Sequence, residues 1–255
     1  MPTIRVKITR DKSNRIITLD LEEYLRGVVP SEMPSTWPIE ALKAQAVAAR
    51  TYAMGKINSS RSYDVDDTTA YQAYRSDRTR ESTDKAVKET AGQVLKYGGK
   101  LISAVYCASN GGKTISAKQK WGHEHAYLPA QSDPYDAASG QKKNGHGVGM
   151  SQHGARQAAL KGLTYKQILS FYYPNTQIVS SGKTSTFKVE ALKVTATSLN
   201  IRKGAGTGYE AISQVSKGTL MLGGERSDGW RHVIGFVDAN KTVDGWASEK
   251  YLEVI

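Results

Sequence analysis

The sequence predicts an α+β protein, with a domain of mixed helices and sheet over residues 1–180 and a small all-β barrel over residues 187–255. Three observations support this fold class. Strand-like alternation opens the chain, and amphipathic helical repeats follow within the first part. Short β-like runs with frequent glycines and no helical period fill the second part. The polar run S-S-G-K-T-S-T at 180–186 is typical of a linker between them.

The chain begins with a predicted strand pair over residues 3–9 and 15–19, joined by a polar turn. A short helix is expected next. Asp20 is a suitable N-cap because its side chain can accept hydrogen bonds from the first turn, and Gly27 is expected to end the helix.

The segment after Gly27 carries a single acid, Glu32, between Pro30 and Pro34. Proline fixes its own φ and biases the preceding residue toward extended conformations, so a stiff, non-helical segment is expected here. A long helix then follows, with Thr36 as its expected N-cap.

This long helix carries two cations, Lys43 and Arg50, on one polar face, because residues seven apart lie on the same side of a helix. A solvated basic face is one interpretation of the pair. The abundance of alanine favours close packing on several sides, and with it a specific target for the cations. The apolar stripe of the helix comprises Ile39, Leu42, Ala46, Ala49 and Ala53.

The middle of the chain is expected to form a helix over residues 82–91 and then a β-hairpin that turns at Gly98-Gly99. The second strand of this hairpin runs into C-A-S-N-G-G-K-T. There, Ser109 and Asn110 meet two glycines at a strand end, which is a common position for functional side chains, although a plain turn also fits.

The run N-G-H-G-V-G-M-S-Q-H-G-A surrounds His146 with glycines and leads into a helix with Ser151 as N-cap. It lacks the G-K-[ST] ending of a phosphate loop. Glycines let a backbone approach a ligand closely, so His146 is a candidate site residue. A further helix opens at Thr164 and Gln167.

The formal net charge is +11, and +9 of it belongs to the first 180 residues. A basic surface favours polyanions such as nucleic acid, anionic lipid or an acidic cell wall. The sequence contains no nucleic-acid motif and no run of about 18 apolar residues that would span a membrane. The N-terminus alternates like a strand and is no signal peptide. The single cysteine, Cys107, excludes an internal disulfide.

Several blocks resemble the SpoIID/LytB family of sporulation peptidoglycan-cleaving proteins and amidase enhancers. They are E-Y-L-R-G-V-V-P-S-E-M-P, E-A-L-K-A-Q-A-V-A-A-R-T-Y-A, A-S-N-G-G-K-T, Y-L-P-A-Q-S-D-P-Y-D and G-H-G-V-G-M-S-Q-H-G-A, and they occur in the family's order. The resemblance covers residues 1–180. The remainder resembles the bacterial Src-homology-3-like domain, which accompanies many cell-wall enzymes.

This resemblance implies a lytic transglycosylase that cleaves peptidoglycan glycan strands, particularly strands stripped of stem peptides. It places the catalytic acid on Glu32. It also implies that cations of the long helix and polar residues of the glycine-rich blocks line the same cleft as substrate-binding residues: Lys43, Arg50, Ser109, His146, Ser151 and Gln152. The chain departs from the family at His153, where tyrosine is frequent, and in having too few cysteines for the thiol-rich zinc site of some relatives.

The chemistry of the residues agrees with this assignment. A glycoside hydrolase generally uses two carboxylates, whereas a lytic transglycosylase needs one acid/base because the 6-hydroxyl of muramic acid attacks to give a 1,6-anhydro end. An apolar pocket around Glu32, next to Met33 and Trp37, is expected to raise the pKa of Glu32. Two alternatives stay open: a non-catalytic, wall-binding amidase enhancer, and a two-carboxylate hydrolase with Asp133 or Asp136 as partner.

The expected partners are peptidoglycan glycan strands and, as the alternative, a cell-wall amidase, with no nucleic acid and no membrane span in this chain. We expect an extracytoplasmic location, in the cell wall or intermembrane space of a bacterium, with the signal or anchor outside this sequence. No cofactor and no metal are expected. Cys107, His123, His125 and His146 are too scattered to form a ligand set.

Overall fold

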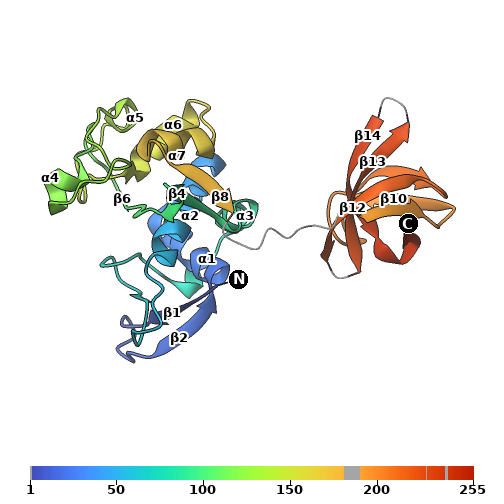
Figure 1. Cartoon of the computed structure of the whole chain (residues 1–255), viewed down its shortest axis with the longest axis horizontal. Helices are drawn as coiled ribbons and strands as arrows, with labels where there is room; N and C mark the ends of the chain where they lie inside the picture. The colour runs from blue at the N-terminus through green and yellow to red at the C-terminus, as the bar shows by residue number, and fades with distance from the viewer. Residues whose placement is uncertain (1, 181–189, 228, 239–240) are drawn as a thin grey trace. The chain divides into compact units, whose positions relative to one another are not determined.

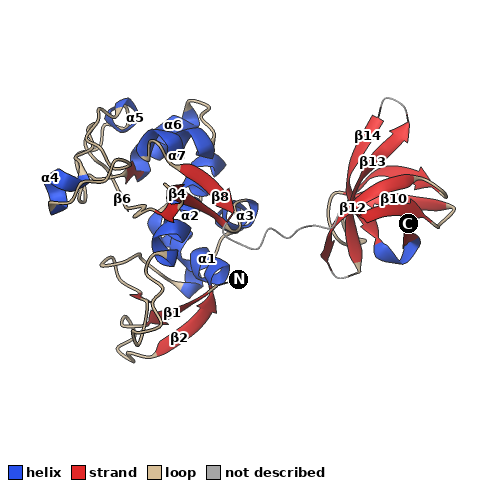
Figure 2. Ribbon diagram, in the orientation of Figure 1, coloured by secondary structure: helices blue, strands red, loops and turns tan. Residues whose placement is uncertain are grey.

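The computed structural model describes residues 2–180, 190–227, 229–238 and 241–255. The chain forms two compact units, Met1–Gly182 and Lys183–Ile255. The first contains all seven α-helices of the described residues, and the second is built almost entirely of strands (Figures 1 and 2). The α+β fold class is therefore confirmed. Residues 181–186 of the expected linker and residue 187, where the barrel was expected to begin, lie outside the described residues.

The first unit opens with a three-stranded sheet in the order β2-β1-β3. The predicted strand pair is confirmed as β1 (Thr3–Lys7) and β2 (Ile16–Asp20), which run antiparallel. Strand β1 also pairs in parallel with β3 (Val65–Asp66). Ile4 and Val6 of β1 are fully buried, so this sheet covers one side of the helical core.

Helix α1 (Leu21–Glu32) is longer than predicted, and the expectation of a stop at Gly27 and a non-helical segment around Glu32 is wrong. Gly27 instead permits a close contact, since a Cβ atom there would lie 2.4 Å from the ring of Tyr74. Pro30 lies inside the helix. An interior proline typically costs about 3 kcal/mol. Burial of the surrounding apolar face outweighs this local cost, and Glu32 becomes the last residue of the helix.

Helix α2 (Ile39–Met54) is the central element of the first unit. Its N-cap is Pro38, which has no side chain to accept a hydrogen bond, so the expectation of Thr36 as the cap is wrong. The predicted close packing is confirmed: α1, α3, β4, α6 and α7 all contact α2. Alanine side chains make this approach possible because they keep the helix narrow. The fully buried ones are Ala41, Ala44, Ala46, Ala48, Ala49 and Ala53.

The predicted helix over residues 82–91 is α3 (Glu81–Glu89), and the predicted hairpin is β4 (Gln93–Tyr97) with β5 (Lys100–Leu101). The second strand of the hairpin ends at Leu101, and Tyr106 and Cys107, which were expected to continue this part of the chain, pair with a different strand. Strand β6 (Tyr106–Cys107) runs parallel to β7 (Met150–Ser151). The other elements of the first unit are the 3-10 turn Ser76–Arg78, α4 (Ala117–Trp121), α5 (Pro134–Ala137), α6 (Gln152–Leu160), α7 (Tyr165–Tyr172) and β8 (Gln177–Ser180), which pairs with β4.

The second unit is a seven-stranded sheet in the order β11-β10-β14-β13-β12-β9-β15, with antiparallel pairing throughout. The all-β character is as predicted, but the barrel is not closed, since the edge strands β11 and β15 do not pair within the described residues. The strands are β9 (Glu190–Val194), β10 (Ser198–Arg202), β11 (Ala211–Ser216), β12 (Leu220–Ser227), β13 (Trp230–Asp238), β14 (Lys241–Ser248) and β15 (Leu252–Val254), and a 3-10 turn spans Glu249–Tyr251.

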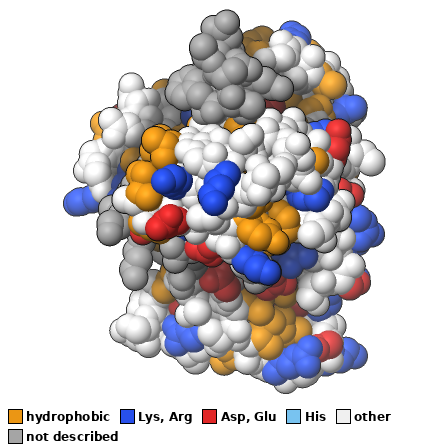
Figure 3. Space-filling view, turned by 90° about the vertical axis from the view of Figure 1, so that its right-hand side faces the viewer, with side chains coloured by type: hydrophobic (Ala, Val, Ile, Leu, Met, Phe, Trp, Pro, Cys, Tyr) orange, Lys and Arg blue, Asp and Glu red, His pale blue; other side chains and the backbone are white. Residues whose placement is uncertain are grey.

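Each unit has its own hydrophobic core. On the face shown in Figure 3, hydrophobic side chains form separate patches among Lys and Arg side chains and do not form one continuous apolar surface. Within the part of the chain that the structure describes, every helix is too short or too polar to cross a membrane.

A buried ion pair between Arg50 and Glu22 joins α2 to α1. The guanidinium is fully buried and binds the carboxylate through two contacts, Nε to Oε1 at 2.8 Å and Nη2 to Oε2 at 2.6 Å. Arg50 also donates to the backbone oxygens of Val87 and Gln93, both at 3.2 Å. The same side chain thus ties α1, α2, the end of α3 and the start of β4 together.

We expect Arg50→Ala to destabilise the first unit by about 3–5 kcal/mol, because it leaves the Glu22 carboxylate and several backbone oxygens without their buried partner. Urea unfolding followed by circular dichroism measures this loss. The matched control is Lys43→Ala on the same helix, at a side chain that is 16% exposed, and its effect should be much smaller. An unchanged midpoint for Arg50→Ala would contradict the structural role of the pair.

Candidate active site

A cavity of about 570 Å³ lies where the end of α1 meets β6 and the glycine-rich loop before β7. Its size is within the range of small-ligand pockets. Glu32 is its one charged side chain among the described lining residues, which are Glu32, Tyr52, Thr69, Ala70, Tyr71, Val105, Tyr106, Cys107, Ala108, Trp121, Asn144, Gly145, His146 and Gln152.

The carboxylate of Glu32 is held by hydrogen bonds from two different parts of the chain. Its Oε1 accepts from the backbone N–H of Ala73 at 2.7 Å, and its Oε2 accepts from Nε2 of Gln152 at 3.2 Å. Burial raises the pKa of Glu32 above its ordinary value, while the bonds from Ala73, Gln152 and the Tyr106 hydroxyl act in the opposite direction. Glu32 therefore keeps its proton to higher pH than an exposed glutamate does.

The parallel pairing of β6 with β7 positions Gln152. In this pair Tyr106 lies opposite Met150 and Cys107 opposite Ser151. Gly149 allows the close approach, because a Cβ atom there would lie 2.2 Å from the carbonyl oxygen of Val105. Helix α6 then starts directly after β7, so its first residue, Gln152, projects toward Glu32.

Two of the predicted site residues, Ser109 and Ser151, belong to a buried network and do not line the cavity. Both hydroxyls donate to the carboxylate of Asp136, at 2.9 Å from Ser109 and 2.5 Å from Ser151. The backbone N–H of Gly112 donates to the same carboxylate at 2.9 Å. Ser151 is also the N-cap of α6, as predicted, and accepts from Gly154 N.

Asp133 is equally enclosed. Its Oδ2 accepts from Nδ2 of Asn110 at 2.7 Å and from the hydroxyl of Tyr172 at 2.8 Å, and its Oδ1 accepts the backbone N–H groups of the first turn of α5. Asp133 and Asp136 are both fully buried. Neither lines the cavity, so this pair offers no second carboxylate beside Glu32 for a two-carboxylate hydrolase.

His146 is one of the residues that line the cavity, and its orientation is fixed. Nδ1 accepts the backbone N–H of Val148 at 3.0 Å, which leaves the proton of the neutral ring on Nε2. Burial lowers the pKa of His146, so the neutral form is favoured at neutral pH. Gly145 and Gly147 on either side have φ of 103° and 76°, a conformation that favours glycine.

The structure does not bring Lys43 or Arg50 to the cavity. The ammonium group of Lys43 pairs with Glu40 at 3.0 Å and Glu89 at 2.7 Å, and these partners raise the pKa of Lys43. Arg50 is buried in its pair with Glu22. The cations of α2 have targets, as its alanine-rich sequence indicates, but these targets are carboxylates of α1, α2 and α3.

Sequence reasoning missed the aromatic side chains of the cavity, Tyr52, Tyr71, Tyr106 and Trp121, and the amide of Asn144. The apolar neighbours expected for Glu32 also differ, since neither Met33 nor Trp37 is among the lining residues. Trp37 packs against His153, with ring centroids 5.1 Å apart. The sequence holds one weak signal for Trp121, an indole directly before a helix-ending glycine, which suggests an exposed position.

The described residues contain no cluster of three or more His, Cys, Asp or Glu side chains arranged to hold a metal ion. Cys107 lies at the cavity wall, and burial raises the pKa of its thiol to about 11, which keeps the unreactive thiol form.

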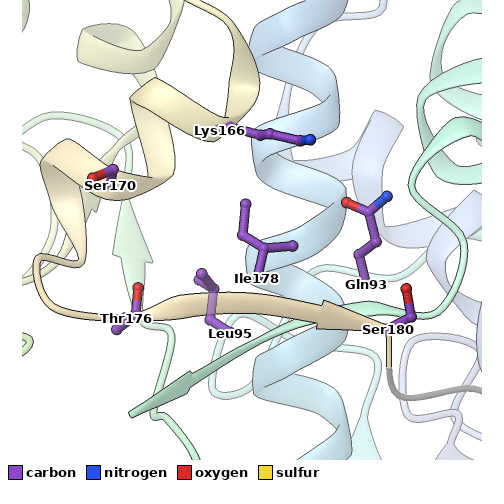
Figure 4. Close-up of a pocket in the computed structure, with 7 residues that line it drawn as sticks. All are labelled: Gln93, Leu95, Lys166, Ser170, Thr176, Ile178 and Ser180. Atoms are coloured by element: carbon purple, nitrogen blue, oxygen red, sulfur yellow. The ribbon is translucent and has the colours of Figure 1, made fainter.

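A second cavity, of about 420 Å³, lies between α7 and the strands β4 and β8 (Figure 4). Lys166 and the hydroxyl groups of Ser170, Thr176 and Ser180 border it. None of its described lining residues is a carboxylate or a histidine, so it offers no counterpart to Glu32 for protonating a glycosidic oxygen.

Comparison with known proteins gives a match of residues 9–97 to the stage II sporulation protein family, SpoIID. The chain is 47% identical over 116 residues to the amidase enhancer of Bacillus subtilis (strain 168), covering 46% of this chain and 16% of that protein. It is 45% identical over 114 residues to an uncharacterized protein of Brachyspira hyodysenteriae, covering 43% of this chain and 31% of that protein. The chain thus spans less than a third of the length of these two relatives.

A third relative matches over a longer region. Stage II sporulation protein D of Bacillus subtilis (strain 168) is 27% identical over 271 residues, covering 69% of this chain and 79% of that protein. The family match includes Glu32 and both ends of the long helix α2. The family match and the named relatives therefore show that the first unit is similar to SpoIID proteins.

Proposed function

We propose that the first unit cleaves peptidoglycan glycan strands as a lytic transglycosylase, with Glu32 as the single general acid/base. The observation that carries this proposal is a lone carboxylate of raised pKa on the wall of a cavity otherwise lined by aromatic, amide and small side chains. General acid catalysis needs a group that is protonated near the working pH, and burial shifts the pKa of Glu32 in this direction.

In the proposed reaction, protonated Glu32 donates its proton to the glycosidic oxygen as the bond from the anomeric carbon breaks. The resulting carboxylate then takes the proton of the muramic 6-hydroxyl while that oxygen bonds to the anomeric carbon. The ring closes to a 1,6-anhydro end, and Glu32 returns to its protonated state without consuming water. Oε2 is the better placed oxygen for this proton, because Oε1 already accepts the short bond from Ala73 N.

A peptidoglycan substrate also implies roles for the two units, a cellular location and a set of substrate-binding residues. Residues 1–180 act as the catalytic domain, and the second unit acts as a bacterial Src-homology-3-like, wall-binding domain. The location is extracytoplasmic, at a bacterial cell wall. Of the predicted substrate-binding residues, His146 and Gln152 line the cavity and are retained in this role. The exposed aromatic side chains Tyr209 and Tyr251 of the second unit are suited to sugar or peptide contacts.

A second candidate function rests on the name of the Bacillus subtilis amidase enhancer. In that case the chain binds the wall and stimulates a cell-wall amidase without cleaving glycan. The two candidate functions can be distinguished at Glu32. Glycan cleavage requires a proton donor in the cavity, whereas amidase stimulation does not.

Glu32→Gln is expected to lower glycan cleavage by about 10²–10⁴-fold, since it removes the proton donor with little change in shape. Mass spectrometry of glycan strands, intact and stripped of peptides, detects the anhydro-muramyl ends. Glu23→Gln, on the exposed side of α1, is the matched control and should keep native turnover. Native turnover in purified Glu32→Gln would exclude Glu32 as the acid, and loss of cleavage with intact amidase stimulation would separate the two functions.

The raised pKa of Glu32 also predicts a pH-dependent stability difference. A carboxyl whose pKa is higher in the folded state stabilises the fold below its unfolded pKa, and this contribution is lost as pH rises through the folded pKa. The free energy of unfolding of the wild type, relative to Glu32→Gln, should therefore fall as pH rises across this interval. Urea titrations at a series of pH values test this. A constant difference between the two proteins would show that burial does not perturb Glu32.

Truncation after Ser180 is expected to preserve turnover and the anhydro product on soluble strands, because Glu32 and its cavity belong entirely to the first unit. Retention on whole sacculi should fall, since a linked binding module raises the local substrate concentration. Sedimentation with sacculi and calorimetry of both proteins provide the measurements. A truncated protein that melts far below the full chain, or is inactive on soluble strands, would make the second unit part of the enzyme.

A further inference from the structure

Trp121 is an exposed indole at the cavity of Glu32 that no core contact requires. It is 44% exposed and is the last residue of α4. This short helix is firmly defined: Ser116 and Gln119 form a capping box at its start, and Gly122 ends it in the left-handed conformation. The local chain therefore fixes the position of the indole without burying it.

His146 lies against this indole. The two ring centroids are 5.4 Å apart and the ring planes are inclined by 53°. Because Nδ1 of His146 accepts the Val148 N–H, the neutral imidazole has its donor at Nε2, and a hydrogen bond to the Tyr106 backbone engages this donor and fixes the ring. An exposed indole and a fixed, neutral imidazole ring are thus placed side by side on one cavity wall.

The rest of the cavity indicates what such a wall would recognise. Its described lining includes the amides of Asn144 and Gln152 but no Lys or Arg side chain. A site for a carboxylate or phosphate normally presents a cation or several backbone N–H groups. A neutral ring with one apolar face and oxygen acceptors at its edge fits the arrangement better, and an N-acetylhexosamine has both features.

We propose that Trp121 and His146 form a sugar-binding platform, on which an N-acetylhexosamine ring of a glycan strand stacks against the indole with the imidazole at its edge. This inference rests on the proposed function of the cavity, since it concerns the strand that Glu32 would cleave. It assigns Trp121 a role in substrate specificity: a sugar ring held here fixes the register of the strand relative to Glu32.

The test is isothermal titration of the full chain, in the Glu32→Gln background, with the β-1,4-linked tetrasaccharide of N-acetylglucosamine. Trp121→Ala should weaken binding by about tenfold, equivalent to about 1.4 kcal/mol, and Trp121→Phe should recover part of the loss. Tyr97→Ala removes an aromatic ring of similar exposure outside the cavity and should bind as the parent does. His146→Ala should also weaken binding, because the imidazole packs against the indole and supports its position.

The Trp121 indole N–H signal in a proton–nitrogen NMR spectrum, assigned with Trp121→Phe, should shift on addition of the N-acetylglucosamine tetrasaccharide. In the cleaving protein, Trp121→Ala should raise KM with kcat largely retained, because stacking stabilises the ground state and transition state alike.

The possible results separate the platform from the proposed reaction. Binding that depends on Trp121, in a wild type that cleaves nothing, would support the platform and contradict the transglycosylase. Unchanged affinity and KM in a folded Trp121→Ala protein, with cleavage intact, would overturn the platform alone. Absence of tetrasaccharide binding to the parent at millimolar concentrations would also overturn it.

Discussion

The buried carboxylate of Asp136 is the interaction on which the candidate active site depends. It is fully enclosed and accepts hydrogen bonds from Ser109, Ser151 and the backbone of Gly112. A buried polar group is tolerated only when its oxygens are satisfied, so these partners are held in one arrangement. Ser151 directly precedes Gln152, and its anchoring positions the amide that reaches Glu32.

This arrangement gives the polar residues of the glycine-rich blocks two different tasks. Ser109 and Ser151 are buried and donate hydrogen bonds to Asp136, which fixes the backbone of both blocks. His146 and Gln152 line the cavity. The glycines between them are needed for backbone contact, most clearly at Gly149, where the Val105 carbonyl leaves no space for a side chain. Most residues of these glycine-rich blocks therefore have a structural role in backbone packing, although the sequence pattern suggests a binding motif.

Charge follows a similar division. The first 180 residues carry +9 of the net charge, yet no Lys or Arg lines the cavity in the described structure. The cations of α2 are neutralised by carboxylates of their own and neighbouring helices. A basic surface of this kind favours the approach of polyanions. The pKa of Glu32 is then set by burial and by its hydrogen-bond donors.

The sequence alone determined the features that depend on neighbouring residues. The strand pair β1–β2, the turn at Gly98-Gly99, the caps at Asp20 and Ser151 and the capping box at Thr164 were all predictable from local pattern and hydrogen-bonding chemistry. The candidate acid, Glu32, was identified from its two flanking prolines and from the resemblance of the surrounding block to a known family.

Only the tertiary structure decided the surroundings of Glu32 and the conformation of its own segment. Gly27 and Pro30 disfavour a helix locally, but packing of the buried face of α1 stabilises it by more than they cost. Residues 73, 106, 121, 146 and 152 converge on Glu32 through strand pairing and loop contacts across as many as 120 positions of sequence. Spacing along a chain carries no record of such long-range pairing, and for that reason the aromatic wall and the buried partner of Arg50 emerge only from the folded protein.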